Sequence, residues 1–368
     1  MTQSEIYYFA GKCLVLDENP EFRKKVLEVC LNDSIDWKQF VAICSNNLIL
    51  PSIYLKFRLH NILEHLPHDL NEHLLEIYEL NRQRNKLIVA QIKFITAVLN
   101  EQNIFPLFFK GAGNLIDDVY SDLGERLMYD IDFMVPEKDF LTSAEIMMNQ
   151  GYLSYSEIDF LENLPNLKVL PKWMHHYPVL YHPDFPAFIE IHRMPTHNKS
   201  KWFNQGIINA EKKAASTLKG CFVPSFQHRI IHNFIHSQLS HKGYLLGNVP
   251  LRDINDLQLL SKQSSLIEIL PKIKKRKTAI AYFAFARNVF GFDDQFFHKQ
   301  NWKYRTLKKK HELMMDSRLF KKFFLSLISI IHFIQGYTVR FFQAFYSKEI
   351  RRAIIKNNRN RLKSMIKK

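Results

Sequence analysis

The feature that most constrains the fold is a pair of aspartates set inside an apolar segment. Asp130 and Asp132 flank Ile131 and precede the apolar run 133–135. Residues two apart in a β-strand project from the same face, so both carboxylates share one face while apolar side chains pack the other. Neighbouring carboxylates repel each other, and a divalent cation removes that cost. Hard oxygen ligands on a strand suit Mg²⁺, so the pattern predicts a metal-binding strand.

A second constraint lies just upstream, where the strand-like run 104–109 meets a glycine-containing turn and the helix-like segment 114–120. Glycine lets a backbone approach a phosphate closely. Ala112 offers no hydroxyl group, so backbone N–H groups would have to do more of the phosphate binding. The segment therefore predicts a phosphate held against a metal, and the candidate nucleotide-binding residues are Lys110, Gly111, Ala112 and Gly113.

A third acid follows in a predicted hairpin. Strand candidates 176–181 and 185–192 are joined by the turn-like tripeptide His182-Pro183-Asp184. In the second strand, Glu190 and His192 project to one face and the isoleucines between and before them to the other. Glu190 is therefore the natural third ligand of the metal.

In this order the residues resemble the nucleotidyltransferase superfamily of DNA polymerase β and the aminoglycoside nucleotidyltransferases. Within it, the chain looks like a poorly characterised bacterial nucleotidyltransferase family that reads Leu-Lys-Gly, Arg, Asp-Ile-Asp and then Glu/Asp-Leu-His. The likeness spans about Lys93 to Leu260. The matching residues are Phe109-Lys110-Gly111, Arg126, Asp130-Ile131-Asp132 and Glu190-Ile191-His192.

The resemblance implies an α+β fold, with a small mixed β-sheet nucleotidyltransferase core and flanking helical domains. It implies Mg²⁺-dependent transfer of a nucleoside monophosphate from an NTP to an acceptor hydroxyl, with Mn²⁺ as the alternative ion. Asp130 and Asp132 would hold the metals, and Glu190 would help to position and deprotonate the attacking hydroxyl. The acceptor would be a small molecule, a sugar or polysaccharide precursor, or an antibiotic-like compound.

Two residues of the pattern keep alternative interpretations. Arg126, just ahead of the acids, either holds phosphate or stiffens the loop through a carboxylate pair. His192 either contacts substrate or orients Glu190.

Further polar residues lie on the helices that follow. His228, His232 and His236 recur every fourth residue, so they share a helix face; packing is favoured over a transition-metal site. His236 and His241 are expected to border the cleft on its substrate side. Asp253 and Asp256 match the family's Leu-Arg-x-x-x-Asp helix and are expected to be structural.

The chain carries a formal net charge of +15 and an isoelectric point near 9.5, which favours polyanionic partners without choosing among them. Much of the excess is local, in 272–277, 308–310 and 351–368. The apolar run 323–339 falls short of the ~20 residues of a membrane span, so a packed helix is expected there. The basic, aromatic tail 340–368 could contact RNA or an anionic membrane. Two alternatives therefore stay open, a toxin-like enzyme acting on RNA or tRNA and a degenerate nucleotide-binding or membrane-associated scaffold.

We expect four regions: an N-terminal helical region (1–102), the nucleotidyltransferase core (103–215), a C-terminal helical domain (216–310), and an apolar then basic tail (311–368). In the long helical segment 71–99, Asn71 and Asn81 mark expected caps or breaks, and the expected buried residues are Leu87, Ala90, Ile92 and Ile95. Residues 156–171 are expected to form a loop. Four isolated cysteines and the lack of a secretory signal favour the cytoplasm, with the inner membrane surface as a peripheral location. The sequence does not encode the oligomeric state.

Overall fold

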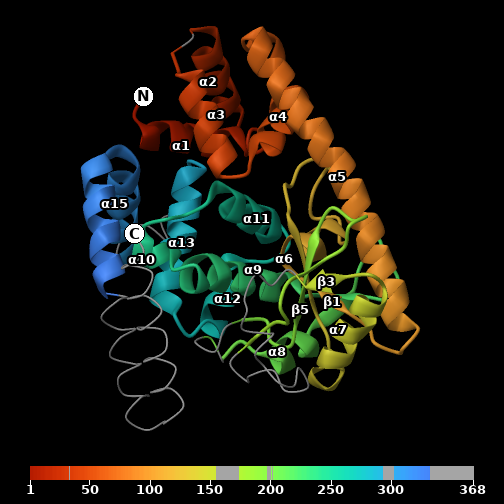
Figure 1. Ribbon diagram of the computed structural model, residues 1–368. Helices are drawn as coiled ribbons and strands as arrows, with labels where there is room; N and C mark the ends of the chain where they lie inside the picture. Colours follow the sequence, from red (N-terminus) through yellow and green to blue (C-terminus); the bar gives the residue numbers. More distant parts are fainter. Residues whose placement is uncertain (33, 155–173, 197–199, 201, 293–301, 332–368) are drawn as a thin grey trace, which may run out of the picture. The chain divides into compact units, whose positions relative to one another are not determined.

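The computed structural model shows an α+β protein with a mixed sheet flanked by helices (Figure 1). It describes the chain except residues 33, 155–173, 197–199, 201, 293–301 and 332–368. The chain divides into two units, Met1–Glu312 and Leu313–Lys368. In the second unit, residues 318–331 are helical, and Leu319 and Phe323 are exposed. This part of the predicted tail helix therefore forms, but it does not bury these side chains.

The N-terminal region is helical, as predicted. Side-chain caps begin three of its helices: Thr2 forms a capping box, and Asn19 and Asp36 accept hydrogen bonds from backbone N–H groups. The elements are α1 (Gln3–Cys13), α2 (Pro20–Leu31), α3 (Trp37–Asn46), α4 (Leu50–Leu59), the 3₁₀ turn η1 (Leu63–His65) and α5 (His68–Asn100).

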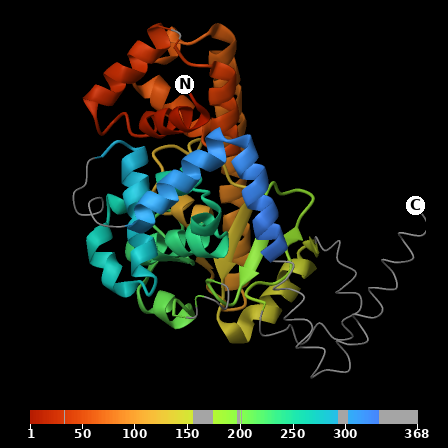
Figure 2. The same ribbon diagram turned by 90° about the vertical axis from the view of Figure 1, so that its left-hand side faces the viewer.

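The long helix α5 corrects one prediction. It runs for 33 residues without a break, so Asn71 and Asn81 neither cap nor interrupt it. Figures 1 and 2 show it leading from the N-terminal helices along the sheet. The buried Asn81 and Asn85 donate hydrogen bonds to the backbone of the loop before the acidic strand, with Asn81 Nδ2 2.8 Å from the Gly124 oxygen. These asparagines fasten the helix to that loop.

The buried face of α5 was also assigned wrongly in part. Leu87 and Ala90 are exposed, whereas Ile92 and Ile95 are buried as predicted. The buried stripe includes the asparagines and Gln91, whose amide group contacts the backbone of Ala187. A prediction from the spacing of hydrophobic residues leaves out such buried polar residues, so it places the buried face at the wrong angle around the helix.

Seven short strands form one mixed sheet in the order β3-β4-β5-β2-β1-β7-β6. β2 pairs with β5 in parallel and with β1 antiparallel, and β4 pairs with β5 as the predicted hairpin. β6 and β7 were not predicted from the sequence. The strands are β1 (Leu107–Phe108), β2 (Asp130–Met134), β3 (Leu153–Ser154), β4 (Leu180–Tyr181), β5 (Phe188–His192), β6 (Lys212–Ala214) and β7 (Phe222–Pro224).

The two faces of the central strands differ as the alternation requires. One face packs against α5 and against α7 (Phe140–Asn149), which follows the 3₁₀ turn η2 (Glu137–Asp139). The strand residues in this core are Ile131, Phe133, Ile189 and Ile191, each fully buried and each worth about 1.5–3 kcal/mol of burial. The opposite face is left for the polar side chains of the same strands.

The glycine segment is helical earlier than predicted. Helix α6 (Lys110–Leu115) begins at Lys110, so both glycines lie inside it, and the helix ends well before Tyr120. A Cβ atom on Gly113 would lie 2.5 Å from the Phe108 carbonyl oxygen. Gly113 is therefore required by the close packing of α6 on β1.

The remaining named helices follow the sheet region in the chain, and the last of them extends past the end of the first unit at Glu312. The helical conformation is interrupted between Ser240 and Gly243 and between Leu246 and Leu251, and the predicted loop 156–171 lies outside the described residues. In the described part of the chain, no single helix combines the length and apolarity needed to cross a bilayer. These elements are α8 (Gln205–Ala210), α9 (Phe226–Phe234), the π-helix η4 (Ile235–Ser240), α10 (Gly243–Leu246), α11 (Leu251–Ser261), α12 (Leu266–Ile269), the 3₁₀ turn η5 (Leu270–Lys272), α13 (Arg276–Val289) and α15 (Trp302–Asp316).

Candidate active site

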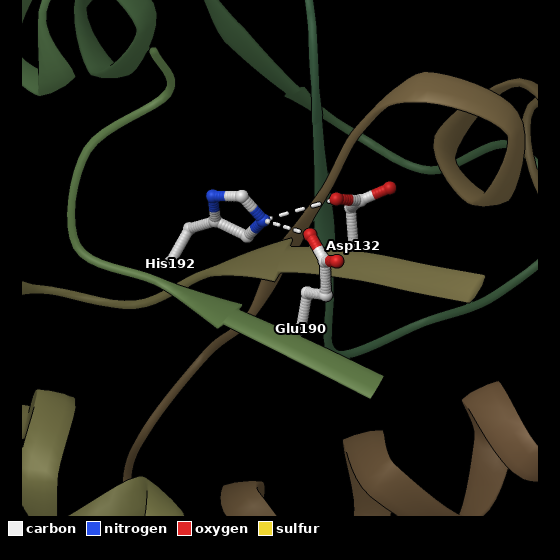
Figure 3. A group of neighbouring side chains, drawn as sticks. All are labelled: Asp132, Glu190 and His192. Atoms are coloured by element: carbon white, nitrogen blue, oxygen red, sulfur yellow. Dashed lines mark hydrogen bonds and ion pairs between the residues drawn. The ribbon is translucent and has the colours of Figure 1, made fainter. Parts of the chain in front are cut away.

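The centre of the candidate site is an acidic pair built by strand register. Asp132 in β2 lies directly opposite Glu190 in the parallel strand β5, so both carboxylates leave the same face of the sheet. His192 follows two residues later, and Figure 3 shows its imidazole directed at both acids. Its Nε2 lies 2.9 Å from Asp132 Oδ1 and 3.3 Å from Glu190 Oε2. His192 thus holds Glu190, which is one of the two expected roles.

These three residues form a group capable of holding a metal ion. One ligand atom from each, carboxylate oxygen or imidazole nitrogen, lies within 4.8 Å of the others. Asp130 projects from the same face two residues earlier in β2, where it lies opposite Phe188 of β5, and it is not part of this group. The structure therefore brings Asp132, Glu190 and His192 together and leaves Asp130 at the exposed rim.

Lys110 supplies a positive charge at the same point. Its ammonium lies 2.6 Å from Asp132 Oδ1, so Lys110 is neither solvated nor directed away from the acids. Its backbone adopts the left-handed conformation with φ of 55°, which is uncommon for a residue other than glycine. Burial opposes the charge of Lys110, but the three neighbouring carboxylates outweigh it and raise the lysine's pKa.

The two aspartates titrate in opposite directions. Burial would raise the pKa of Asp132, yet Lys110 and His192 outweigh it and hold that pKa well below its usual range. The pKa of Asp130 is raised, because its carboxylate is partly desolvated and is repelled by Asp132, although Lys110 opposes the shift. Asp132 is consequently the firmly ionised acid, and Asp130 is the one that gains most from an added cation.

A cleft adjoins the acids, between the sheet side of the site and helices α9, η4 and α11. Its cavity volume is about 150 Å³, which is less than the roughly 300–1,000 Å³ of typical small-molecule sites. Among the residues with roles predicted from sequence, Lys110, Gly111, Arg126, Asp130 and His236 line it.

Ala112 and Gly113 lie elsewhere. Ala112 is buried in the sheet-side core, and Gly113 packs on Phe108. His241 lies behind His236, with the ring centroids 4.3 Å apart. The structure therefore separates the predicted phosphate segment into a cleft-lining part and a packed part.

The alternatives for Arg126 narrow to the carboxylate pair. Its guanidinium is buried and binds Asp256 through three contacts, Nε to Oδ1 at 3.0 Å, Nε to Oδ2 at 3.1 Å and Nη2 to Oδ2 at 3.0 Å. Tyr120 donates a hydrogen bond to the same carboxylate over 3.0 Å. Burial opposes the charge of Arg126, but Asp256 outweighs it and raises its pKa. Asp256 is therefore structural, as predicted, with a partner that the sequence did not reveal.

A second buried ion pair was missed from the sequence. Arg229 in α9 lies 2.5 Å from Asp117 Oδ2, and Lys213 reaches the same oxygen over 2.8 Å. Asp117 follows α6 in the chain, so its contacts with Arg229 and Lys213 hold the end of α6 against α9 and β6. A separation of 112 residues in the chain leaves no local pattern by which it could have been found.

The histidine stripe serves packing. His232 Nε2 is 2.8 Å from the Pro195 carbonyl oxygen, and His228 lies 3.6 Å from Glu211. Burial lowers the pKa of His232 to about 4, so this imidazole is neutral. Within the described residues, the group with metal-ligand geometry consists of Asp132, Glu190 and His192.

The chain belongs to the family described as uncharacterised nucleotidyltransferases, whose sequence model matches residues 33–297, and it is therefore a transferase of nucleoside monophosphate groups. Enzymes of this kind generally use divalent metals and act on a nucleotide and an acceptor.

The solution structure of the antibiotic-resistance factor ANT(2'')-Ia is similar, with 14% sequence identity, a TM-score of 0.35, and coverage of 56% of this chain and 97% of that one. No curated protein matches the chain. Family membership rests on the family match alone.

Proposed function

We propose that the protein transfers a nucleoside monophosphate from an NTP to the hydroxyl of a small acceptor in an Mg²⁺-dependent reaction. The observation that carries the proposal is the pairing of Asp132 with Glu190 across β2 and β5, beside a cleft lined by Lys110 and Asp130. The position already attracts cations, because Lys110 and His192 both approach Asp132 Oδ1.

The donor atoms fit a hard divalent cation. Asp132, Glu190 and the rim residue Asp130 offer carboxylate oxygens from one sheet face, and such oxygens suit Mg²⁺ and Mn²⁺. These three residues would hold the ion, which when bound neutralises charge on the phosphates during transfer. The pKa of Asp130 is raised first by burial and then by repulsion from Asp132, and a bound cation would oppose both effects.

The chain's own residues then have distinct tasks. The acceptor oxygen forms a bond to the α-phosphorus, the bond from that phosphorus to its bridging oxygen breaks, and pyrophosphate leaves. Glu190, whose side chain is 21% exposed, receives the proton of the acceptor hydroxyl, and His192 fixes its orientation. Lys110 contributes positive charge at the phosphates from the edge of the cleft.

The charges of the cleft favour a small acceptor over RNA. Its lining contains the cations Lys110, Arg126, Arg229 and Arg252. The same lining contains the acids Asp130, Asp253 and Asp256, so the balance is four to three. A groove that follows a nucleic acid backbone needs a clear excess of lysine and arginine. The charge balance of the cleft therefore favours a small acceptor over RNA.

The test incubates the purified protein with each NTP labelled at the α-phosphorus, Mg²⁺ and a cell extract. Label should enter the small-metabolite fraction with wild type and not with Asp132→Asn or Glu190→Gln. Asp184→Asn is the matched control, because Asp184 lies in the same hairpin with its side chain 88% exposed. Label entering RNA would replace the small acceptor by RNA, and absence of label with every NTP would overturn the proposal.

A further inference from the structure

Most of the cationic side chains that line the cleft are already bound to partners. Lys110 lies 2.6 Å from Asp132, and Arg126 makes its bidentate pair with Asp256. Arg229 lies 2.5 Å from Asp117 and donates to the Pro224 oxygen over 2.9 Å. Each of these charges is therefore already partly neutralised by a carboxylate before an anion enters.

Arg252, the second residue of α11, differs from these three. Within the described part of the chain, its side-chain contacts are two long ones, from Nε at 3.4 Å and Nη2 at 3.5 Å, both to Asp253 Oδ1. Asp253 is the next residue in the same helix, and adjacent helical residues do not face each other. The Arg252 side chain is 26% exposed, so its guanidinium is accessible from the cleft.

Arg252 lines the same cleft as Asp130, the rim residue of the acidic site. Asp130 marks the end of the site away from Glu190, because Asp132 and not Asp130 pairs with Glu190 in the strand register. Arg252 therefore stands at the Asp130 end of the row of acids.

The direction of in-line transfer determines which part of the NTP lies at the Asp130 end of the row of acids. Under the proposed function, Glu190 activates the acceptor hydroxyl, and the leaving group departs on the side of the α-phosphorus opposite the acceptor. The departing pyrophosphate consequently lies toward Asp130. A guanidinium suits this position, because its planar fork matches two phosphate oxygens at once.

We propose that Arg252 binds the pyrophosphate portion of the NTP, which makes α11 a substrate-binding element. This inference rests on the proposed function and adds a contact residue from the helical region to it. Arg252 neutralises the charge that grows on the departing pyrophosphate, while Lys110 remains beside Asp132 until substrate enters.

The test compares binding of each NTP, the corresponding NMP and inorganic pyrophosphate in Mg²⁺ buffer without acceptor, by titration calorimetry. Arg252→Gln should weaken NTP and pyrophosphate binding about 10- to 100-fold, since hydrogen bonds to charged groups are of that strength, and should leave NMP binding within about twofold. Arg252→Lys keeps a point charge without the fork and should fall between the two. Arg305→Gln, an exposed arginine of α15, is the control.

The outcomes separate this inference from the proposed function. Wild-type protein that binds none of the NTPs would overturn both. Wild-type binding with Arg252→Gln unchanged would overturn the inference alone, as would an equal loss of NTP and NMP affinity. Denaturant unfolding of Arg252→Gln should match wild type, because the contacts of this side chain in the described part of the chain are the two long ones to Asp253. A large loss of stability would assign Arg252 to the fold.

Discussion

Replacing Asp256 by asparagine would strand the guanidinium of Arg126 in the interior. The two side chains are only 9% and 8% exposed, and the carboxylate is the partner in three contacts of 3.0–3.1 Å. Breaking a buried ion pair from one side typically costs about 3–5 kcal/mol, because the remaining charge keeps its desolvation penalty. We expect Asp256→Asn to lower the free energy of unfolding by an amount in that range.

Urea unfolding followed by circular dichroism measures this cost. Arg82→Gln is the control, because its pair with Asp122 spans 3.5 Å with 39% and 23% exposure, and such pairs contribute about 0–1 kcal/mol. A double variant, Arg126→Met with Asp256→Leu, removes both charges and should recover much of the loss.

The same variants test the role assigned to Arg126. An Asp256→Asn protein within about 1 kcal/mol of wild type would refute the buried-pair reasoning. A stable Arg126→Met protein with weakened NTP affinity would restore the alternative, in which Arg126 holds phosphate. The account expects the reverse, a destabilised protein whose folded fraction keeps its NTP affinity.

The remaining predictions concern packing and pH. Gly113→Ala should destabilise the protein by about 1–3 kcal/mol in urea unfolding, because the new Cβ would lie 2.5 Å from the Phe108 oxygen. The control Gly206→Ala, whose new Cβ would have its nearest neighbour at 3.3 Å, should change stability by less than about 1 kcal/mol. Equal effects of the two substitutions would argue against close packing of α6 on β1. Stability should fall as the pH drops from 6.5 toward 4, because the unfolded chain binds a proton on His232 near pH 6.5 and the folded chain only near pH 4, a difference worth about 3 kcal/mol. Unfolding at several pH values checks this, and His232→Gln should flatten the dependence; an unchanged slope would show that other groups cause it.

The two acidic strands could be predicted well because the patterns that define them lie within short stretches of sequence. A period of two decides which face Asp132 and Glu190 share, and a proline-containing turn is sufficient to predict the hairpin that carries Glu190. The helical regions followed from apolar spacing for the same reason. The strand register that brings the two acids level was implied by the family resemblance.

Other features depend on contacts between distant residues. Arg126 and Asp256 are 130 positions apart, so a pairing preference could be suspected but not assigned. The phase of α5 was missed because Asn81, Asn85 and Gln91 are buried to bind loop carbonyls, an arrangement that hydrophobicity does not indicate. The left-handed backbone of Lys110, which places its ammonium at Asp132, is likewise set by tertiary packing.

The most direct test of the central claim is the rate of Mg²⁺-dependent transfer from α-labelled NTP, measured for wild type, Asp132→Asn, Glu190→Gln and the control Asp184→Asn. The account predicts that wild type and the control transfer label equally, that EDTA abolishes transfer, and that Glu190→Gln slows it by at least about 100-fold, as expected for loss of a general base. Asp132→Asn should be inactive, because it removes the acid at the centre of the cluster. Transfer at the wild-type rate by Asp132→Asn or Glu190→Gln would contradict the account.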